Sequence, residues 1–208
     1  MPQASVLLAF LAATLALNFT PGADMAYVVA RSLSQGRRAG VLSALAITAG
    51  CMVHIGLATL GLAALLAHSP LAFRLLQYAG AGYLLFIAWR LLRERVRTGR
   101  APVVPARYGR IFVQGVLTNV LNPKVALFIL AFLPQFVDPA RGSSTAQMLI
   151  LGALFCVSGT IVNGTIALLT ARAGRAVAGS SAAALWLRRV SAGILALLAI
   201  RLAFAARP

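Results

Sequence analysis

Two polar, proline-containing stretches interrupt apolar runs of this chain and bring its rarest charges with them. Residues 18–24 read NFTPGAD, and residues 119–124 read NVLNPK. Lys124 is the only lysine, and Asp24 is one of three acids. An acid and a base held together in apolar surroundings are complementary to a zwitterion, whose ammonium and carboxylate groups need one partner each. The alternative is that the two charges only pair with each other and fix the packing.

Each stretch can end one helix and start another. Asn122 is a favourable N-cap, and Pro123 is a favourable first helical residue. Pro21 and Gly22 can restart another helix. Helix N-termini present free N–H groups and partial positive charge, which suit a carboxylate. We therefore predict one binding site built from both stretches, with the residues Asn18, Thr20, Pro21, Gly22, Asp24, Asn119, Asn122, Pro123 and Lys124.

The composition indicates that membrane spans hold these residues. The 208 residues are 61% hydrophobic and 11% charged, whereas a soluble domain carries about 25% charged residues. The net charge of +16 comes from arginines between apolar runs, which is typical of loops facing anionic lipid and not of a nucleic-acid-binding face. A span needs about 20 apolar residues. The candidates are 4–30, 40–67, 71–90, 111–136, 146–171 and 190–206, and residues 174–187 are expected to form an amphipathic or irregular connector.

The loop charges predict the orientation, because short cytoplasmic loops collect lysine and arginine. The first loop holds Arg31, Arg37 and Arg38, the third is the basic stretch 93–110, and the fifth carries Arg172 to Arg189. These alternate loops must share one side of the membrane. We predict that they are cytoplasmic and that both termini lie outside.

The two halves of the chain show internal similarity. Residues 81–91 (AGYLLFIAWRL) match residues 192–202 (AGILALLAIRL) at six of eleven positions, and the first helix of each half carries a polar break. Three helices per half is an odd number, so the second half must be inverted relative to the first. The predicted fold is an all-α integral membrane protein of about six transmembrane helices. It forms two inverted three-helix repeats with broken first helices, residues 1–92 and 111–208, joined by a basic cytoplasmic linker at 93–110.

Other residues leave alternatives open. His54 lies near the centre of the second span, where it either relays protons or bonds a backbone carbonyl.

Cys51 and Cys156 occupy comparable places in the second and fifth spans, so a membrane thiol–disulfide relay is a second candidate function, although neither thiol has a neighbouring base to activate it. A cation-resistance transporter would need clustered His, Asp or Glu, which the sequence lacks. We expect neither a metal nor a cofactor. The polar stripe on the fifth span is expected to hydrogen-bond to neighbouring helices and so stabilise their packing. Its residues are Ser158, Thr160, Asn163 and Thr165.

Several motifs resemble those of the LysE/RhtB family of amino-acid exporters. They are TPGAD at 20–24, GRRAG at 36–40, AGAGYLL at 79–85, and NVLNPK at 119–124 with FLPQF at 132–136. Ala23 departs from the second proline that the family usually has there, so the first break should be softer.

The resemblance implies a six-helix secondary carrier of the bacterial inner membrane, coupled to the proton gradient, with Asp24 and His54 as coupling candidates. It also implies export of a small amino acid, within a range from basic residues to homoserine, threonine, leucine and cysteine derivatives. A single acid and a single base in the site leave no partner for a cationic side chain, so we expect a neutral substrate. The expected partners are this amino acid and membrane lipid but no nucleic acid, and a homo-oligomer is left open.

Overall fold

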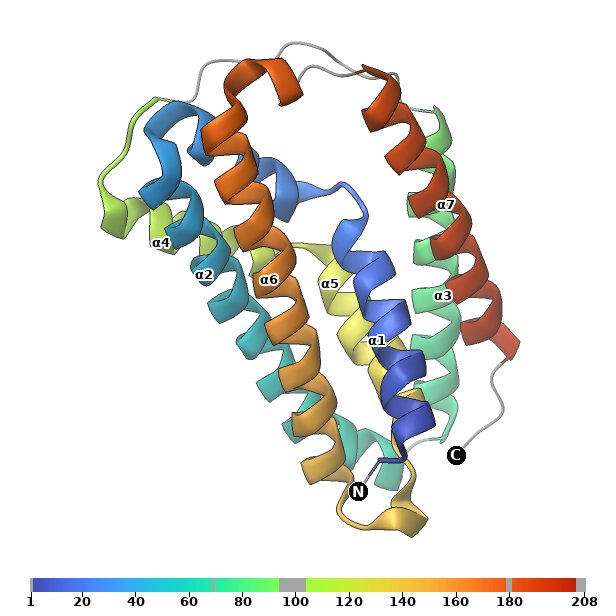
Figure 1. Cartoon of the computed structure of the whole chain (residues 1–208). Helices are drawn as coiled ribbons and strands as arrows, with labels where there is room; N and C mark the ends of the chain where they lie inside the picture. The colour runs from blue at the N-terminus through green and yellow to red at the C-terminus, as the bar shows by residue number, and fades with distance from the viewer. Residues whose placement is uncertain (1, 69, 94–103, 179–180, 205–208) are drawn as a thin grey trace.

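The computed structural model describes residues 2–68, 70–93, 104–178 and 181–204, and the regular elements in these ranges are all helical (Figure 1). The predicted linker lies mostly at 94–103, outside the described residues. The elements are α1 (Ala4–Phe19), α2 (Ala23–His68), α3 (Pro70–Arg93), α4 (Tyr108–Val120), α5 (Pro123–Leu127), a π-helical turn η1 (Phe128–Phe132), the 3₁₀ turns η2 (Leu133–Phe136) and η3 (Pro139–Arg141), α6 (Ser144–Ala178) and α7 (Ser181–Phe204).

Two of these helices are long and apolar enough to cross a membrane unaided. They are Ala23–Gly61 within α2 and Ser144–Arg172 within α6. Helix α4 and the following segment Pro123–Phe136 pass the same test together, with a bend of 49° between them. Among the described residues, length and composition therefore support two or three spans in an integral membrane protein. The count of six and the inverted repeat remain predictions.

Helix α2 consists of two helical arms joined at Gly36. Its φ of 76° and ψ of −167° fall in a region that essentially only glycine adopts. We call residues 23–35 the short arm and residues 37–68 the long arm. The prediction that Arg31 belongs to a loop is wrong, because the chain turns at Gly36 and Arg31 is buried within the short arm.

The predicted connector at 174–187 is also largely helical. Helix α6 continues to Ala178 and α7 already begins at Ser181. Alanine-rich sequence favours helix, and this explains why the helices extend beyond the apolar segments that were expected to form the spans.

The helices pack as two neighbouring groups. Helix α2 lies along α6 and α4, while α3 lies along α7. Figure 1 shows α3 and α7 side by side and running in opposite directions, the arrangement required if they are equivalent helices of inverted repeats. The predicted superposition of Gly82 on Gly193 and of Arg90 on Arg201 stays untested.

Glycines permit the closest helix contacts beside the breaks. A Cβ on Gly50 of α2 would lie 2.8 Å from the Asn119 Cβ, and one on Gly115 of α4 would lie 2.6 Å from the Ala46 Cβ. Small residues at such crossings allow helix backbones to approach in membranes, where packing contributes much of the helix association. The break in α4 is thereby held against the long arm of α2.

An aromatic core joins α1 to the segment that follows the second break. Phe10 is fully buried, and its ring centroid lies 6.2 Å from that of Phe128 and 5.2 Å from that of Phe136. The outer surface is apolar as well, with Leu60 80% exposed and Leu197 66% exposed. Contiguous exposed apolar surface suits lipid contact and is unusual on soluble monomers.

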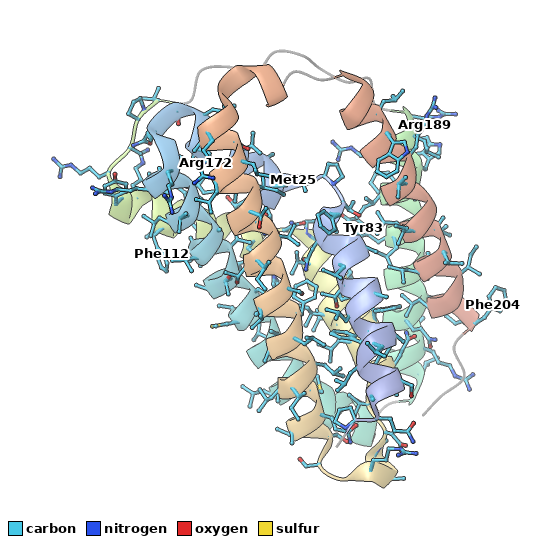
Figure 2. All side chains as sticks on the ribbon, in the orientation of Figure 1. Met25, Tyr83, Phe112, Arg172, Arg189 and Phe204 are labelled. Carbon is cyan, nitrogen blue, oxygen red and sulfur yellow. The ribbon has the colours of Figure 1, made fainter. Side chains whose placement is uncertain are left out.

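Basic residues gather at one end of the bundle. Figure 2 shows Arg172 and Arg189 at the end opposite the start of α1. The turn between the two arms of α2, the end of α6 and the start of α7 lie toward the same end, while α1 begins and α7 ends in the other half (Figure 1). This grouping is the one expected from the loop charges.

Candidate functional site

Both predicted helix breaks are present. Helix α1 ends at Phe19 and α2 begins at Ala23, with Asp24 in its first turn. Helix α4 ends at Val120, and α5 begins at Pro123 after the N-cap Asn122, whose side chain accepts a hydrogen bond from the Lys124 backbone N–H at 3.1 Å. The local rules for proline, glycine and N-cap residues therefore placed both restarts correctly.

Lys124 connects the second break to the first. Its Nζ donates to the Leu17 carbonyl at 3.2 Å and to the Thr20 carbonyl at 3.0 Å. These oxygens lie at the C-terminal end of α1, where carbonyls lack partners within the helix and the helix dipole is negative. A Cβ on Gly22 would lie 3.3 Å from Nζ, so this glycine leaves room for the ammonium group. The buried lysine thus caps α1.

Asp24 bonds a different partner. Its Oδ2 accepts a hydrogen bond from the Asn119 Nδ2 at 2.9 Å, whereas its Oδ1 is buried without a partner. In the described part of the chain, Asp24 and Lys124 line the same cavity but form no direct ion pair. In this conformation the two charged groups therefore do not bond each other directly, and each has other partners.

The amide side chains near the breaks are only partly bonded. The Asn119 Oδ1 and the Asn122 Nδ2 are buried without partners. Asn18 instead donates to the Ser158 Oγ at 3.2 Å, and the Thr20 hydroxyl donates to the Ala16 carbonyl at 2.8 Å. Unsatisfied buried polar atoms are rare in native proteins, and a polar ligand or water in the adjoining cavity would satisfy the Asn119 Oδ1.

A cavity of about 30 Å³ lies between the breaks. This is room for about one or two water molecules, so in this conformation, which we call closed, the cavity is too small for an amino acid. Asn122, Pro123, Pro21, Gly22 and His54 are not among the lining residues; they shape or support the breaks. The polar side chains that line the cavity are Asn18, Thr20, Asp24, Thr48, Asn119, Lys124 and Asn163.

The N–H groups at the start of α5 are already occupied. Asn122 caps the Lys124 N–H with its side chain, and its backbone carbonyl accepts from the Val125 and Ala126 N–H groups, both at 3.1 Å. The expectation of free N–H groups for a carboxylate therefore does not hold for α5 in this conformation. The Lys124 ammonium, which has three N–H donors and uses two, keeps one available.

His54 bonds a backbone group, which is one of its two predicted roles. Its Nε2 lies 3.1 Å from the Asn119 carbonyl oxygen, and the side chain is buried. The same carbonyl, near the end of α4, also accepts the Asn122 backbone N–H at 2.9 Å, so the His54 bond is an additional contact at the point where the helix is interrupted. His54 therefore supports the second break from the long arm of α2.

Other cavity residues were not among the predicted binding residues. Asn163 belongs to the polar stripe of α6, which was assigned to packing. Two members of that stripe do join helices, because Ser158 accepts a hydrogen bond from Asn18 and the Thr160 hydroxyl bonds that of Thr48. The sequence feature that could have identified Asn163 as a cavity residue was its place on that stripe. Cys51 and Cys156 also line the cavity, and their Sγ atoms lie 3.3 Å apart across α2 and α6. Within the described ranges, no three His, Cys, Asp or Glu side chains gather closely enough to hold a metal ion.

An all-helical chain with an apolar exterior, in which two interrupted helices enclose a buried polar cavity, has the features of a membrane carrier. The family model described as LysE type translocator matches residues 15–206. The chain belongs to this family, which confirms the prediction from its motifs. It is therefore a multi-pass membrane translocator of the amino-acid exporter type. Members of this family are transporters and not enzymes.

Relatives of the chain carry names that fit this class. It is 32% identical over 171 residues to an uncharacterized membrane protein of Vibrio cholerae serotype O1, covering 82% of this chain and 83% of the relative. It is 32% identical over 155 residues to a homoserine/homoserine lactone efflux protein of Salmonella typhimurium, covering 74% of this chain and 75% of the relative. The homoserine/homoserine lactone efflux protein of Salmonella typhi is 31% identical over 155 residues, with the same coverage. No solved structure matches the chain.

Proposed function

We propose that this translocator exports a small neutral amino acid of the homoserine type from the bacterial cytoplasm, coupled to the proton gradient. The observation that carries the proposal is the cavity between the two helix breaks, which is lined by Asp24, with its unpaired Oδ1, and by Lys124. The names of the Salmonella relatives support the same substrate class.

The free hydrogen-bonding groups suggest how a zwitterion binds. Its ammonium group would donate to the Asp24 Oδ1 and to the Asn119 Oδ1, which have no partners in the closed conformation. Its carboxylate would accept the remaining Lys124 N–H. Charge-assisted hydrogen bonds of this kind are the stronger ones in proteins. Because the cavity holds only water-sized space, the helices must separate to admit the substrate.

The cavity lining favours a polar side chain on the substrate. Thr48 and Asn163 line the cavity in addition to the charged residues. The Thr48 hydroxyl is already bonded within the protein, so the Asn163 amide is the group that favours a hydroxyl-bearing ligand, because an aliphatic one leaves it unpaired. Homoserine and threonine therefore fit better than leucine. A basic side chain fits worst, since Asp24 is the only acid among the lining residues.

Asp24 is also the stronger candidate for proton coupling. The same carboxylate would bind either the substrate ammonium or a proton, so release of one would favour uptake of the other. His54 is the second candidate, but its Nε2 is engaged at the Asn119 carbonyl and the ring does not line the cavity. We further propose the inner membrane as location and both termini outside. A cysteine introduced at position 100 should then be labelled only from the cytoplasmic face.

Counterflow in proteoliposomes tests the proposed function. Vesicles loaded with unlabelled L-homoserine should take up labelled L-homoserine faster than protein-free vesicles, and L-threonine should compete. The other proteinogenic amino acids serve as a specificity panel. Acceleration by lysine or arginine alone would contradict the neutral substrate, and no acceleration by any amino acid would contradict the function.

A further inference from the structure

Among the described residues, Arg31 is a buried cation without an acidic partner. Its side chain, on the short arm of α2, is only 6% exposed. Nη1 donates to the Gln35 Oε1 and to the Val104 carbonyl, both at 3.1 Å. Nη2 donates to the Gln114 Oε1 at 2.8 Å, and the guanidinium carbon lies 5.5 Å from the centre of the Tyr27 ring. Every hydrogen-bond acceptor that these contacts supply is a neutral oxygen.

The hydrogen-bonding capacity of Arg31 is incomplete. A guanidinium has five N–H donors and stays charged at any physiological pH. The Nε of Arg31 is buried and has no partner. Buried charges in native proteins are normally paired, so the chemistry that is missing beside this side chain is an anionic oxygen.

An open groove of about 610 Å³ begins at this guanidinium and runs between the short arm and α4. Ala23 and Ala30 form one wall, and Leu117 and Leu121 form the other. The two leucines are 50% and 75% exposed. Because Arg31 lies at the far end of the short arm from Ala23, the groove has one charged end. Gln114 lies at that end and bonds the guanidinium, and the rest of the lining is apolar except for Tyr27 and Thr118.

The charged end of the groove lies beside other basic residues. Gln35 binds Ala106 through two hydrogen bonds of 2.8 and 2.9 Å, which fix the end of the basic linker to the short arm. The exposed Arg107 follows directly, and the exposed Arg37 and Arg38 follow the kink at Gly36. Basic pockets between transmembrane helices near the cytoplasmic surface bind the headgroups of anionic lipids.

We propose that this groove is a binding site for an anionic phospholipid. A phosphate oxygen accepts hydrogen bonds from Arg31, and one acyl chain lies between Ala30 and Leu117. The lipid then holds the short arm against α4. These two segments carry Asp24 and Asn119, so the bound lipid stabilises the arrangement of the proposed transport site.

Thermal unfolding of the purified full-length protein in neutral detergent tests this proposal. The probes are phosphatidylglycerol, phosphatidylcholine with the same acyl chains, and inorganic phosphate. Phosphatidylglycerol should raise the Tm by roughly 2–4 °C, and the other two probes should not. The variant Arg31→Gln should lose this rise, whereas Arg37→Gln, which removes an exposed charge from the same end, should keep it.

A second variant separates lipid binding from the role of Arg31 in packing. Ala30→Trp fills the groove and leaves the guanidinium and its hydrogen bonds in place, so it should also lose the lipid-dependent rise. Native mass spectrometry should show fewer retained phosphatidylglycerol molecules on Ala30→Trp than on the wild type. An equal rise in Tm for Ala30→Trp and the wild type would overturn the proposal, as would the full effect with inorganic phosphate alone, which would indicate a simple anion site.

Discussion

The substitution Asp24→Asn removes one negative charge while keeping the shape of the side chain. In the structure the Asp24 Oδ2 accepts the Asn119 Nδ2 at 2.9 Å, and an asparagine still offers one oxygen for that bond. The other oxygen, which has no partner, is replaced by an NH₂ group. This group cannot accept a hydrogen bond from a substrate ammonium. The variant should therefore fold and insert, with its binding site specifically impaired.

The size of the effect follows from the bond that is lost. A hydrogen bond to a charged group contributes about 1.5–3 kcal/mol, which corresponds to a roughly 10- to 150-fold weaker affinity. Half-saturation of homoserine counterflow should rise by a factor in this range. Export should also lose most of its dependence on the proton gradient, because Asp24 is the only acid that lines the cavity.

The matched control is Asp138→Asn. Asp138 lies in the loop before α6 and pairs with Arg141 at 2.8 Å, with both side chains almost half exposed. Exposed pairs of this kind contribute about 0–1 kcal/mol, so homoserine affinity should not change. If Asp24→Asn binds homoserine within about twofold of the wild-type affinity, Asp24 is not the ammonium partner and the proposed site is wrong.

Three further substitutions test other parts of the structure. Lys124→Met removes two charge-assisted bonds to the end of α1 and should destabilise the protein by on the order of 3 kcal/mol. Adding Asp24→Asn to this variant should not restore the Tm. Recovery of the Tm in the double variant would indicate a direct ion pair between Asp24 and Lys124. The double change of Cys51 and Cys156 to serine should leave counterflow nearly unchanged, and complete loss would favour the thiol relay. Gly36→Ala should cost about 1–3 kcal/mol because of its backbone conformation, while Gly56→Ala, in a helix with nothing within 4 Å, should be neutral or slightly stabilising; equal Tm values would argue against the kink.

Local chemistry made part of the site predictable from sequence. Asn122 with Pro123 forms a helix start that needs no tertiary information, and the same holds for the stop before Pro21 and Gly22. The bond of His54 to a backbone carbonyl follows from the scarcity of other partners within a span. These features depend on residues adjacent in the chain or on general rules for buried polar groups.

The partners of the buried charges could not be predicted in the same way. Lys124 bonds carbonyls of α1, which lie 104 and 107 residues earlier in the chain, and no residue type marks a carbonyl as a partner. Arg31 looked like a loop charge because the position of the turn depends on Gly36. Its burial depends on the packing of α4 against the short arm, which is a contact between segments far apart in the sequence.

Contacts around the cavity join four of the described segments in two pairs, which we call units. The short arm of α2 and α4 are joined by the Asp24–Asn119 bond and by the Tyr27 hydroxyl, which donates to the Ile111 carbonyl at 2.7 Å. Helix α1 and the segment after the second break are joined by Lys124 and by the contact of Phe10 with Phe128. The joints between the units are the two breaks, where the backbone is not helical.

A zwitterion bound as proposed would bridge these units, because its ammonium group contacts Asp24 and its carboxylate contacts Lys124. Homoserine should therefore raise the Tm of the protein, since a ligand that binds only the folded state stabilises it. Two analogues that each keep the hydroxyl separate the contributions: 3-aminopropan-1-ol lacks the carboxylate, and 4-hydroxybutanoate lacks the ammonium group. Each can bind only one unit, so neither should raise the Tm measurably at a concentration where homoserine does. A rise with 4-hydroxybutanoate equal to that with homoserine would show that Asp24 takes no part in holding the units together, and that Lys124 alone recognises the ligand.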